Sequence, residues 1–258
     1  MPSFRKINLI LWTAVIVTLL CCPFSLYALP EVDNVAEGEV NIETPDSTTL
    51  NITTLTDKAI INYRQFNIAQ NETVRFIQPS VNSSALNRDL SGIVSQILGN
   101  LFANGSIILI NPAGINIGQN ANINVASIIA STLDISNQDF LSGNYKFFKN
   151  GGNAFLFNQG NIIIRNGGYV ALLSQAVENS GRITAELGTV VLASGEAMTL
   201  ALDDLNEISV VIDEAVKSGV LGFDSAIKNS GTISANGGKV ILTAKVLNDV
   251  FDYAINNS

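Results

Sequence analysis

The chain has 258 residues, 47% of them hydrophobic, with 14 basic and 22 acidic residues. This acidic balance argues against nucleic acid and anionic lipid surfaces as partners, because both carry negative charge. A chain of this length can bury one sizeable core. Gly, Asn, Ser, Thr and β-branched residues are frequent and long helical apolar stripes are scarce, so the sequence predicts an all-β fold.

The amino-terminal residues have the pattern of a Sec signal peptide. An apolar run over residues 7–22 follows two basic residues, and Ala28 offers the small side chain that a cleavage site needs. The run is short for a membrane span. A lipoprotein signal is the alternative, since Cys21 lies near the modified position, but the preceding Leu20 is bulkier than such a site prefers. We expect residues 1–28 to be removed.

The mature chain would contain neither Cys nor His, and its 12 basic and 22 acidic residues give a net charge of −10. These absences exclude His-dependent triads, thiol nucleophiles and the usual zinc sites, although carboxylates remain. We expect no enzymatic activity, no metal and no cofactor. A disulfide made in the periplasm would also close a loop in a chain that must later cross a second membrane unfolded. A chain that simply needs no disulfide is the other interpretation.

Residues 29–50 carry acids, Thr and Pro without a clear pattern, and we expect a lead-in or linker there. Shorter alternating strands follow in residues 52–78. They are expected to cap the amino-terminal end of the fold, because an open end would expose unpaired backbone and apolar side chains. The cap strands would contain Phe66, Phe76, Gln78 and Pro79.

A turn interrupts what otherwise reads as one long strand between Ile107 and Gly118. Pro112 has a fixed φ and no amide proton, so it cannot lie in a central ladder. Gly114 can adopt a positive φ. The segment Asn111–Gly114 is therefore predicted to be a tight turn that joins two strands. Another coil is expected after it, marked by Ile123, Val125 and Ile128.

Three segments further along repeat one pattern, an Asn-x-Gly turn, a short strand, a glycine turn and a second strand. They begin at Asn158, Asn179 and Asn229. The first two begin 21 residues apart, which is too short for two hairpins that each close a core but suits one coil of a solenoid. We predict a right-handed parallel β-helix whose inward residues stack between coils: Ile183, Ala185, Val190 and Leu192 beside Ile233, Ala235, Val240 and Leu242.

The third copy begins 50 residues after the second, and the extra segment near 198–214 reads as a β-hairpin that protrudes from the solenoid. Its acids could bind calcium or act as the acid pair of a glycan-cleaving enzyme. A solvated hairpin with Asp at its turn is the simpler interpretation. Residues 255–258 resemble the start of a fourth repeat, so we expect this chain to be the front portion of a longer protein. The acids near the hairpin are Asp203, Asp204, Glu207, Asp213 and Glu214.

Residues 60–140, read in order, resemble the amino-terminal secretion domain of filamentous-haemagglutinin-type exoproteins, the passengers of two-partner secretion (TPS). The Asn-Pro-Asn-Gly-Ile signature of that family occurs at Asn111–Ile115 with Ala113 in place of the second Asn, whereas its Asn-Pro-Asn-Leu signature is absent. The missing Asn side chain would affect a turn hydrogen bond or a transporter contact. Further ordered matches are Ile61–Ile68, Val74–Pro79, Leu86–Arg88, Ser95–Gly99, Ala103–Gly105, Ala130–Asp134 and Asp139–Phe140.

The resemblance implies a secretion and folding-nucleus domain over residues 51–140, continued by β-helix coils over 141–258. Its partner would be an outer-membrane β-barrel transporter whose periplasmic POTRA-type modules read the chain while it is still extended. The whole protein would be a secreted or surface-bound adhesin of a Gram-negative cell, binding a host or neighbouring cell through its missing carboxy-terminal part. The implied recognition residues are Asn111, Pro112, Gly114, Ile115, Asn87 and Arg88.

The role of the turn can be tested at Asn111. If the turn is only structural, Asn111→Asp should leave secretion nearly intact, because Asp tolerates similar turn geometry. If the transporter reads the turn, the substitution should reduce secretion, because it removes an amide donor and adds a charge.

A β-helix that binds or cleaves glycans is the alternative function. Cleavage would need clustered Asp, Lys or Arg on one face of the solenoid. The basic residues of this chain are sparse and scattered, so the secretion function is favoured.

Overall fold

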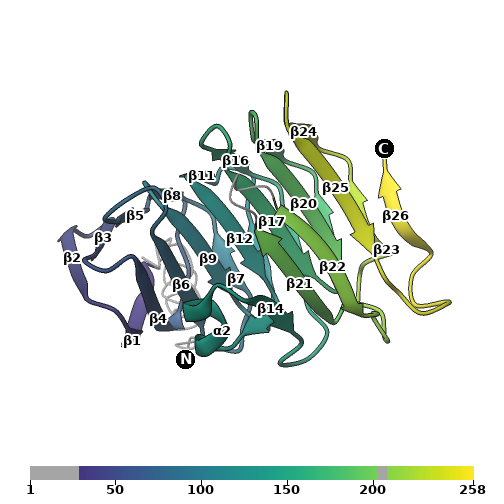
Figure 1. The fold of residues 1–258 in the computed structure, drawn as a ribbon, viewed down its shortest axis with the longest axis horizontal. Coiled ribbons are helices and arrows are strands. Elements are labelled where there is room, and N and C mark those ends of the chain that lie inside the picture. Colours follow the sequence, from purple (N-terminus) through teal and green to yellow (C-terminus); the bar gives the residue numbers. More distant parts are fainter. Residues whose placement is uncertain (1–28, 203–207) are drawn as a thin grey trace, which may run out of the picture.

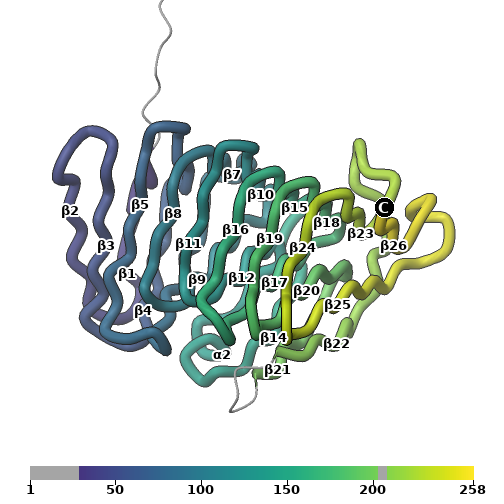
Figure 2. The backbone as a smooth tube through the Cα atoms, turned by 90° about the horizontal axis from the view of Figure 1, so that it is seen from above, coloured from purple at the N-terminus to yellow at the C-terminus, as the bar shows by residue number. Residues whose placement is uncertain are grey.

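The computed structural model describes residues 29–202 and 208–258, which wind into a parallel β-helix along the long axis of the molecule (Figure 1). Figure 2 shows the coils stacked from the amino-terminal to the carboxy-terminal end, with strands in three sheets; the first coils give strands to two of them, and the third sheet begins at β7. In spatial order, sheet A contains β1 (Glu31–Glu37), β4 (Lys58–Gln65), β6 (Ser84–Asp89), β9 (Ser106–Ile110), β12 (Ser127–Ser131), β17 (Tyr169–Ser174), β20 (Thr189–Ser194) and β25 (Lys239–Ala244).

The other two sheets of the coil follow the same order along the axis. Sheet B contains β2 (Val40–Asp46), β3 (Thr49–Thr54), β5 (Thr73–Ile77), β8 (Asn100–Ala103), β11 (Asn122–Val125), β16 (Asn161–Ile164), β19 (Arg182–Thr184) and β24 (Thr232–Ser234). Sheet C contains β7 (Ser95–Ile97), β10 (Ile115–Ile117), β15 (Phe155–Asn158), β18 (Ala176–Asn179), β23 (Ser225–Asn229) and β26 (Tyr253–Asn257).

The predicted inward residues stack between coils as expected. The copies that begin at Asn179 and Asn229 pair residue by residue, and the inward side chains of the first copy are fully buried in the interior. The predicted fold, a right-handed parallel β-helix, is thereby confirmed, as is the turn that separates β9 from β10. The inward pairs are Ile183 with Ile233, Val190 with Val240 and Leu192 with Leu242.

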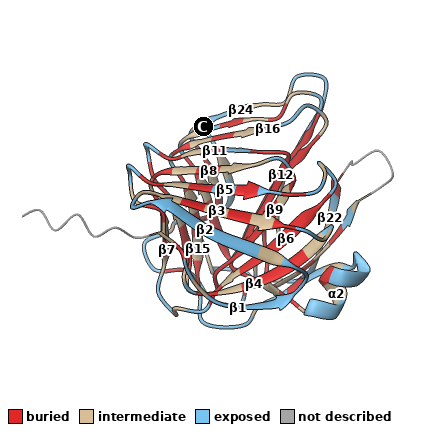
Figure 3. Cartoon of the chain, turned by 90° about the vertical axis from the view of Figure 1, so that its left-hand side faces the viewer, coloured by how far each residue is buried: buried red, intermediate tan, exposed pale blue. Residues whose placement is uncertain are grey.

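An antiparallel cap closes the amino-terminal end. β1 pairs with β4, and β2 pairs with β3, both in antiparallel orientation, whereas β4 and β3 pair in parallel with β6 and β5. Residues 29–50 therefore form the outermost strands, and the expectation of a lead-in or linker is wrong. Both cap strands are largely exposed (Figure 3). They consequently lack the apolar alternation by which a strand is recognised in a sequence.

The cap lies upstream of the residues that the sequence assigned to it. Phe76 belongs to β5, which pairs in parallel with β3 and β8. Phe66 and Gln78 are buried just beyond β4 and β5, and Pro79 is exposed. These four residues therefore belong to the first parallel coils and the turns between them.

A fourth, antiparallel sheet lies on the outer face of sheet A. Two insertions of the coil build sheet D, and the first also contains the short helix α2 (Asn137–Ser142). The pairing of β21 with β22 confirms the predicted hairpin, although Asp203, Asp204 and Glu207 lie outside the described residues. In the described parts of the chain, we find no helix with the length and apolar character to cross a membrane. Sheet D contains β13 (Asp134–Ile135), β14 (Tyr145–Phe148), β21 (Ala197–Leu202) and β22 (Ile208–Glu214).

The central strands of sheet A are consequently buried on both faces. Their inward side chains line the interior of the coil, and their outward side chains pack against Phe140, Phe147, Met198 and Leu200 of the insertions. All residues of β12, β17 and β20 are buried. Burial on both faces explains why sheet A strands read as continuous apolar runs, such as residues 107–110, where a strand with one buried face would alternate.

Candidate functional site

The predicted turn at Asn111–Gly114 lies where the chain passes from sheet A to sheet C. The side chain of Asn111 is fully buried. Its Oδ1 accepts a hydrogen bond from the Ala113 N–H at 2.8 Å. Its Nδ2 donates to the Ile93 carbonyl at 2.8 Å and to Ser95 Oγ at 2.9 Å. Asn111 thus holds its own turn and the loop of the preceding coil together.

Gly114 closes the turn with a φ of +129°, a conformation that favours glycine. Its N–H donates to the Asn111 carbonyl at 3.1 Å, and its carbonyl accepts from the Ser95 N–H at 3.1 Å. A Cβ atom here would lie 3.2 Å from Val94 Cγ2 and 3.3 Å from the Phe155 carbonyl oxygen. Both the backbone conformation and the available space therefore favour glycine.

A buried carboxylate beneath the turn joins successive coils. Asp89 Oδ2 accepts hydrogen bonds from the Phe66 N–H at 2.9 Å and from the Ser95 hydroxyl. Asp89 Oδ1 accepts from the Ser91 N–H at 2.8 Å. Since Ser95 Oγ also accepts from Asn111, a chain of hydrogen bonds runs from the end of β4 to the turn. These bonds compensate the loss of water around the buried charge.

Asp89 and Ser95 are neighbours of the candidate site that sequence reasoning misses. Asp89 is followed by Leu-Ser-Gly, which reads as an ordinary surface turn where Asp is favoured. Ser95 reads as the start of a short strand. Only the stacking of coils places both beneath Asn111, and no local pattern indicates this.

Arg88, a predicted recognition residue, is anchored to the first insertion. Its Nε donates to Asp134 Oδ1 at 2.8 Å, and its Nη1 donates to Asn137 Oδ1 at 2.7 Å. Its Nη2 donates to the Ile135 carbonyl. The side chains of Arg88 and Asp134 are only 11% and 16% exposed, so water screens this ion pair less than a surface pair. Arg88 therefore holds β6 to sheet D and α2.

Asn87 and Ile115, also predicted recognition residues, point into the interior. Asn87 Oδ1 accepts from the Tyr63 hydroxyl at 2.8 Å, and its Nδ2 donates to the Ala85 and Ile108 carbonyls at 3.0 and 3.3 Å. Ile115 is fully buried in the core. In the folded domain, neither side chain is available to a partner.

A cavity of about 210 Å³ lies beside the turn. It brings together three of the predicted recognition residues, Arg88, Asn111 and Pro112, from two coils. Ala113 also lines it, at the position where the family signature has Asn. The side-chain hydrogen bonds of the turn come from Asn111. Ala in place of Asn at position 113 therefore leaves these bonds intact and changes the wall of the cavity instead. The lining residues are Arg88, Asp89, Leu90, Gly92, Ile110, Asn111, Pro112, Ala113, Asp134 and Asn150.

The described acids of the hairpin are engaged in local contacts. Asp213 Oδ2 accepts from the Thr199 hydroxyl at 2.8 Å, and Glu214 Oε2 lies 2.8 Å from Lys217 Nζ. Over residues 29–202 and 208–258, no three His, Cys, Asp or Glu side chains are grouped so as to hold a metal ion. The remaining acids of the calcium hypothesis, at 203–207, lie outside this range.

Comparisons with known proteins point to one family. The family model of the TPS secretion domain matches residues 29–258, a range that includes both the first coils and the repeats. A heme/hemopexin-binding protein of Haemophilus influenzae strain Rd is 38% identical over 226 residues, covering 84% of this chain and 24% of that protein. A second H. influenzae protein of the same name is 37% identical over 136 residues, covering 51% of this chain and 15% of that protein.

A solved structure resembles this fold closely. The crystal structure of the HMW1 secretion domain from H. influenzae matches with a TM-score of 0.74 and 33% sequence identity. The match covers 83% of this chain and 57% of the HMW1 chain. The chain spans about a quarter of the length of the first heme/hemopexin-binding protein.

Proposed function

The chain belongs to the TPS secretion domain family, and from this premise we propose that a dedicated outer-membrane transporter reads the segment Asn111–Ile115 before that segment folds. The transporter would be a β-barrel with periplasmic POTRA-type modules. As a secretion domain, the chain directs export across the outer membrane to the cell surface or the medium. The complete burial of Asn111 is the observation that carries the proposal.

Burial removes the side chains of Asn111 and Ile115 from any partner, whereas Pro112 and Ala113 are half-buried at the cavity. The amide of Asn111 uses its oxygen for Ala113 and its nitrogen for Ile93 and Ser95. Ile115 is packed in the core. In an extended chain, by contrast, the Asn amide, the Pro ring and the Ile side chain are all exposed. A transporter that reads these groups therefore has to meet the chain before it folds.

Folding and recognition exclude each other because the turn depends on several coils. The Asn111 N–H donates to the Ser131 carbonyl of the next coil at 3.0 Å, while its side chain contacts the preceding coil. The turn is complete only when these coils have stacked. Stacking outside the cell would withdraw the segment from the transporter. It would also bury apolar side chains, which favours outward movement of the chain.

The test uses Ala113→Arg, which alters the signature without touching the hydrogen bonds of Asn111. Ala113 is half-buried and faces the cavity. In cells that also make the transporter, the amount of this variant outside the cell should fall severalfold. Ala254→Arg, at an exposed position of β26, is the matched control. Refolded Ala113→Arg should keep the urea midpoint of the wild type, so that lost secretion reports lost recognition. Secretion at the control level would contradict the proposal.

We also propose that the whole protein is a surface protein that contacts a host or neighbouring cell through parts outside these residues. Two relatives are named for binding heme and hemopexin, whereas residues 29–258 offer few of the usual ligands of heme iron. His, Cys and Met are the common protein ligands of heme iron. Residues 29–258 contain no His or Cys, and Met198 is buried between sheets A and D. We propose that the role of this domain is non-enzymatic.

A further inference from the structure

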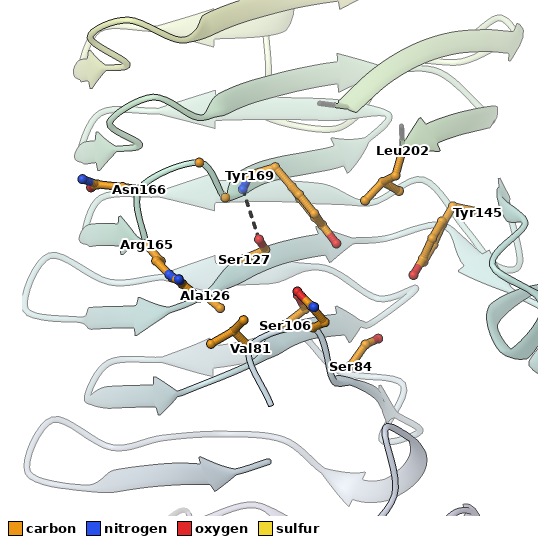
Figure 4. Close-up of a pocket in the computed structure, with 13 residues that line it drawn as sticks. Val81, Ser84, Ser106, Ala126, Ser127, Tyr145, Arg165, Asn166, Tyr169 and Leu202 are labelled. Carbon is orange, nitrogen blue, oxygen red and sulfur yellow. Dashed lines mark hydrogen bonds between the residues drawn. The ribbon is translucent and has the colours of Figure 1, made fainter. Parts of the chain in front are cut away.

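A second cavity, of about 470 Å³, opens on the outer face of sheet A, at the opposite end of its strands from the Asn111 turn (Figure 4). Its volume is in the range of about 300–1,000 Å³ that is typical of small-molecule sites. The first residues of β6, β9 and β12 line it and pair in register: Ser84, Ser106 and Ser127. Their hydroxyl groups repeat at the strand spacing of about 4.8 Å.

Two tyrosines and one turn complete the walls. Tyr169 begins β17, the strand next to β12, and Tyr145 begins β14 of sheet D. Both phenol groups extend toward the row of serines in Figure 4. Arg165 and Asn166, in the turn before Tyr169, are exposed on the side away from Tyr145. The cavity therefore combines hydroxyl groups, aromatic rings and one rim guanidinium, and no carboxylate lines it.

Among the polar groups that line the cavity, the Ser84 hydroxyl lacks a hydrogen-bond partner that meets the usual geometry. Its Oγ is buried and has no hydrogen-bond partner among the described residues. Ser127 Oγ, by contrast, accepts from the Tyr169 N–H at 3.1 Å (Figure 4). The Tyr145 hydroxyl lies close enough for Ser84 to act on its pKa: burial raises the pKa of the Tyr145 phenol, and the Ser84 side chain offsets part of that rise, so the O–H stays protonated. A buried hydroxyl without a partner is unfavourable unless a bound group supplies one.

We propose that this cavity binds a pyranose unit of a glycan. A sugar ring presents an apolar C–H face to an aromatic ring and hydroxyl groups at its edge, and tyrosines and serines offer the matching groups. The serine row supplies donors and acceptors along the length of one ring. A phosphate or carboxylate ligand would instead require several converging cations or N–H groups, whereas Arg165 is the sole charged side chain in the lining and stands at the rim.

Calorimetric titration of the full secreted chain tests the proposal. The probes are glucose, galactose, N-acetylglucosamine and glucuronic acid, with inorganic phosphate as the anion. At least one sugar should bind, and Ser84→Ala and Tyr145→Leu should each weaken that binding tenfold or more. Ser209→Ala and Tyr253→Leu are the matched controls, since both residues are exposed and lie outside the cavity. Both controls should bind like the wild type.

The stability of each variant is measured by urea unfolding, in parallel with its sugar binding. Ser84→Ala removes a buried hydroxyl that has at most a weak contact with Tyr145, so its urea midpoint should stay close to that of the wild type. Lost sugar binding in a stable Ser84→Ala variant supports the site. Three results would each overturn it: none of the four sugars binds, only phosphate binds, or a sugar binds Ser84→Ala as tightly as the wild type.

Discussion

The side-chain amide of Asn179 donates a hydrogen bond to the side-chain oxygen of Asn229, one coil further along, at 2.7 Å. Asn158 donates to Asn179 at 2.7 Å, and Asn229 donates to Asn257 at 2.8 Å. The Asn-x-Gly repeat of the sequence is therefore an asparagine ladder. Asn257, in the segment that resembles a fourth repeat, accepts the hydrogen bond from Asn229 and continues the ladder. The repeated turn is held by side-chain pairing between coils as well as by its own backbone.

The first prediction concerns this ladder. Asn179→Ala should lower the free energy of unfolding by about 1–3 kcal/mol, because it leaves a donor of Asn158 and an acceptor of Asn229 without partners. Asn41→Ala, at an exposed position of the cap, is the control and should change stability by less than about 0.5 kcal/mol. Urea unfolding measures both. Equal effects would show that the ladder does not stabilise the coils.

The second prediction tests the interior. Val190 is fully buried between stacked coils, and Val190→Asp should prevent stable folding, because burying an unpaired carboxylate is highly unfavourable. Val211→Asp, at a position of β22 that is 60% exposed, should fold normally. Circular dichroism and resistance to protease distinguish the two. A Val190→Asp chain that melts at the temperature of the wild type would contradict the inward orientation of Val190.

The third prediction concerns the turn glycine. Gly114→Val should lose at least about 1–3 kcal/mol of stability, since Gly114 has a positive φ and a Cβ there would lie tight against Val94 and Phe155. Gly152→Val is the control, because a Cβ at Gly152 would meet nothing within 4 Å. Urea midpoints of the two refolded variants give the measurement. If Gly152→Val loses as much stability as Gly114→Val, the strained turn is not the cause.

The fourth prediction concerns pH. Glu196 lies 3.1 Å from Lys149 Nζ and 3.5 Å from Lys217 Nζ. Burial acts to raise the pKa of Glu196, but hydrogen bonds and charges from both lysines outweigh it and lower that pKa below its ordinary value. A lower pKa in the folded state means that the carboxylate stabilises the fold above its unfolded pKa. This contribution is lost as the pH falls through the folded pKa.

Replacing this carboxylate should therefore flatten the pH dependence of stability. Between about pH 7 and about pH 3, the wild type should lose more unfolding free energy than Glu196→Gln, measured in urea at each pH. Loss of the same amount by both proteins would show that Glu196 does not contribute to acid sensitivity.

The coil could be predicted from local patterns. Period-two alternation identifies Val190 and Leu192 as inward residues, and Pro112 with Gly114 identifies the turn, because both signals lie within a few residues. Sheet D could not be placed in this way, since its packing on sheet A joins insertions that are far apart in the chain. Continuous apolar runs, such as residues 107–110, were the available indication that both faces are buried. The cap strands escaped prediction because solvent covers most of their side chains.

The site could be predicted only in part, and one expectation about it is wrong. The resemblance identified Arg88 and Asn111, which the structure places at one cavity. Asp, however, does not suit the Asn111 position. The Nδ2 of Asn111 donates to the Ile93 carbonyl, and a carboxylate oxygen there would face another acceptor. Asn111→Asp would thus damage the turn as well as recognition, which is why Ala113→Arg is the sharper secretion test.

The central claim is that the transporter reads the chain before the turn folds, and the binding of folded and unfolded chains to the purified periplasmic modules tests it most directly. Val190→Asp supplies an unfolded chain without denaturant. We predict that the modules bind this chain at least tenfold more tightly than the folded wild type, and that adding Asn111→Ala to it weakens binding. Binding of the folded wild type as tight as that of the Val190→Asp chain would contradict the account.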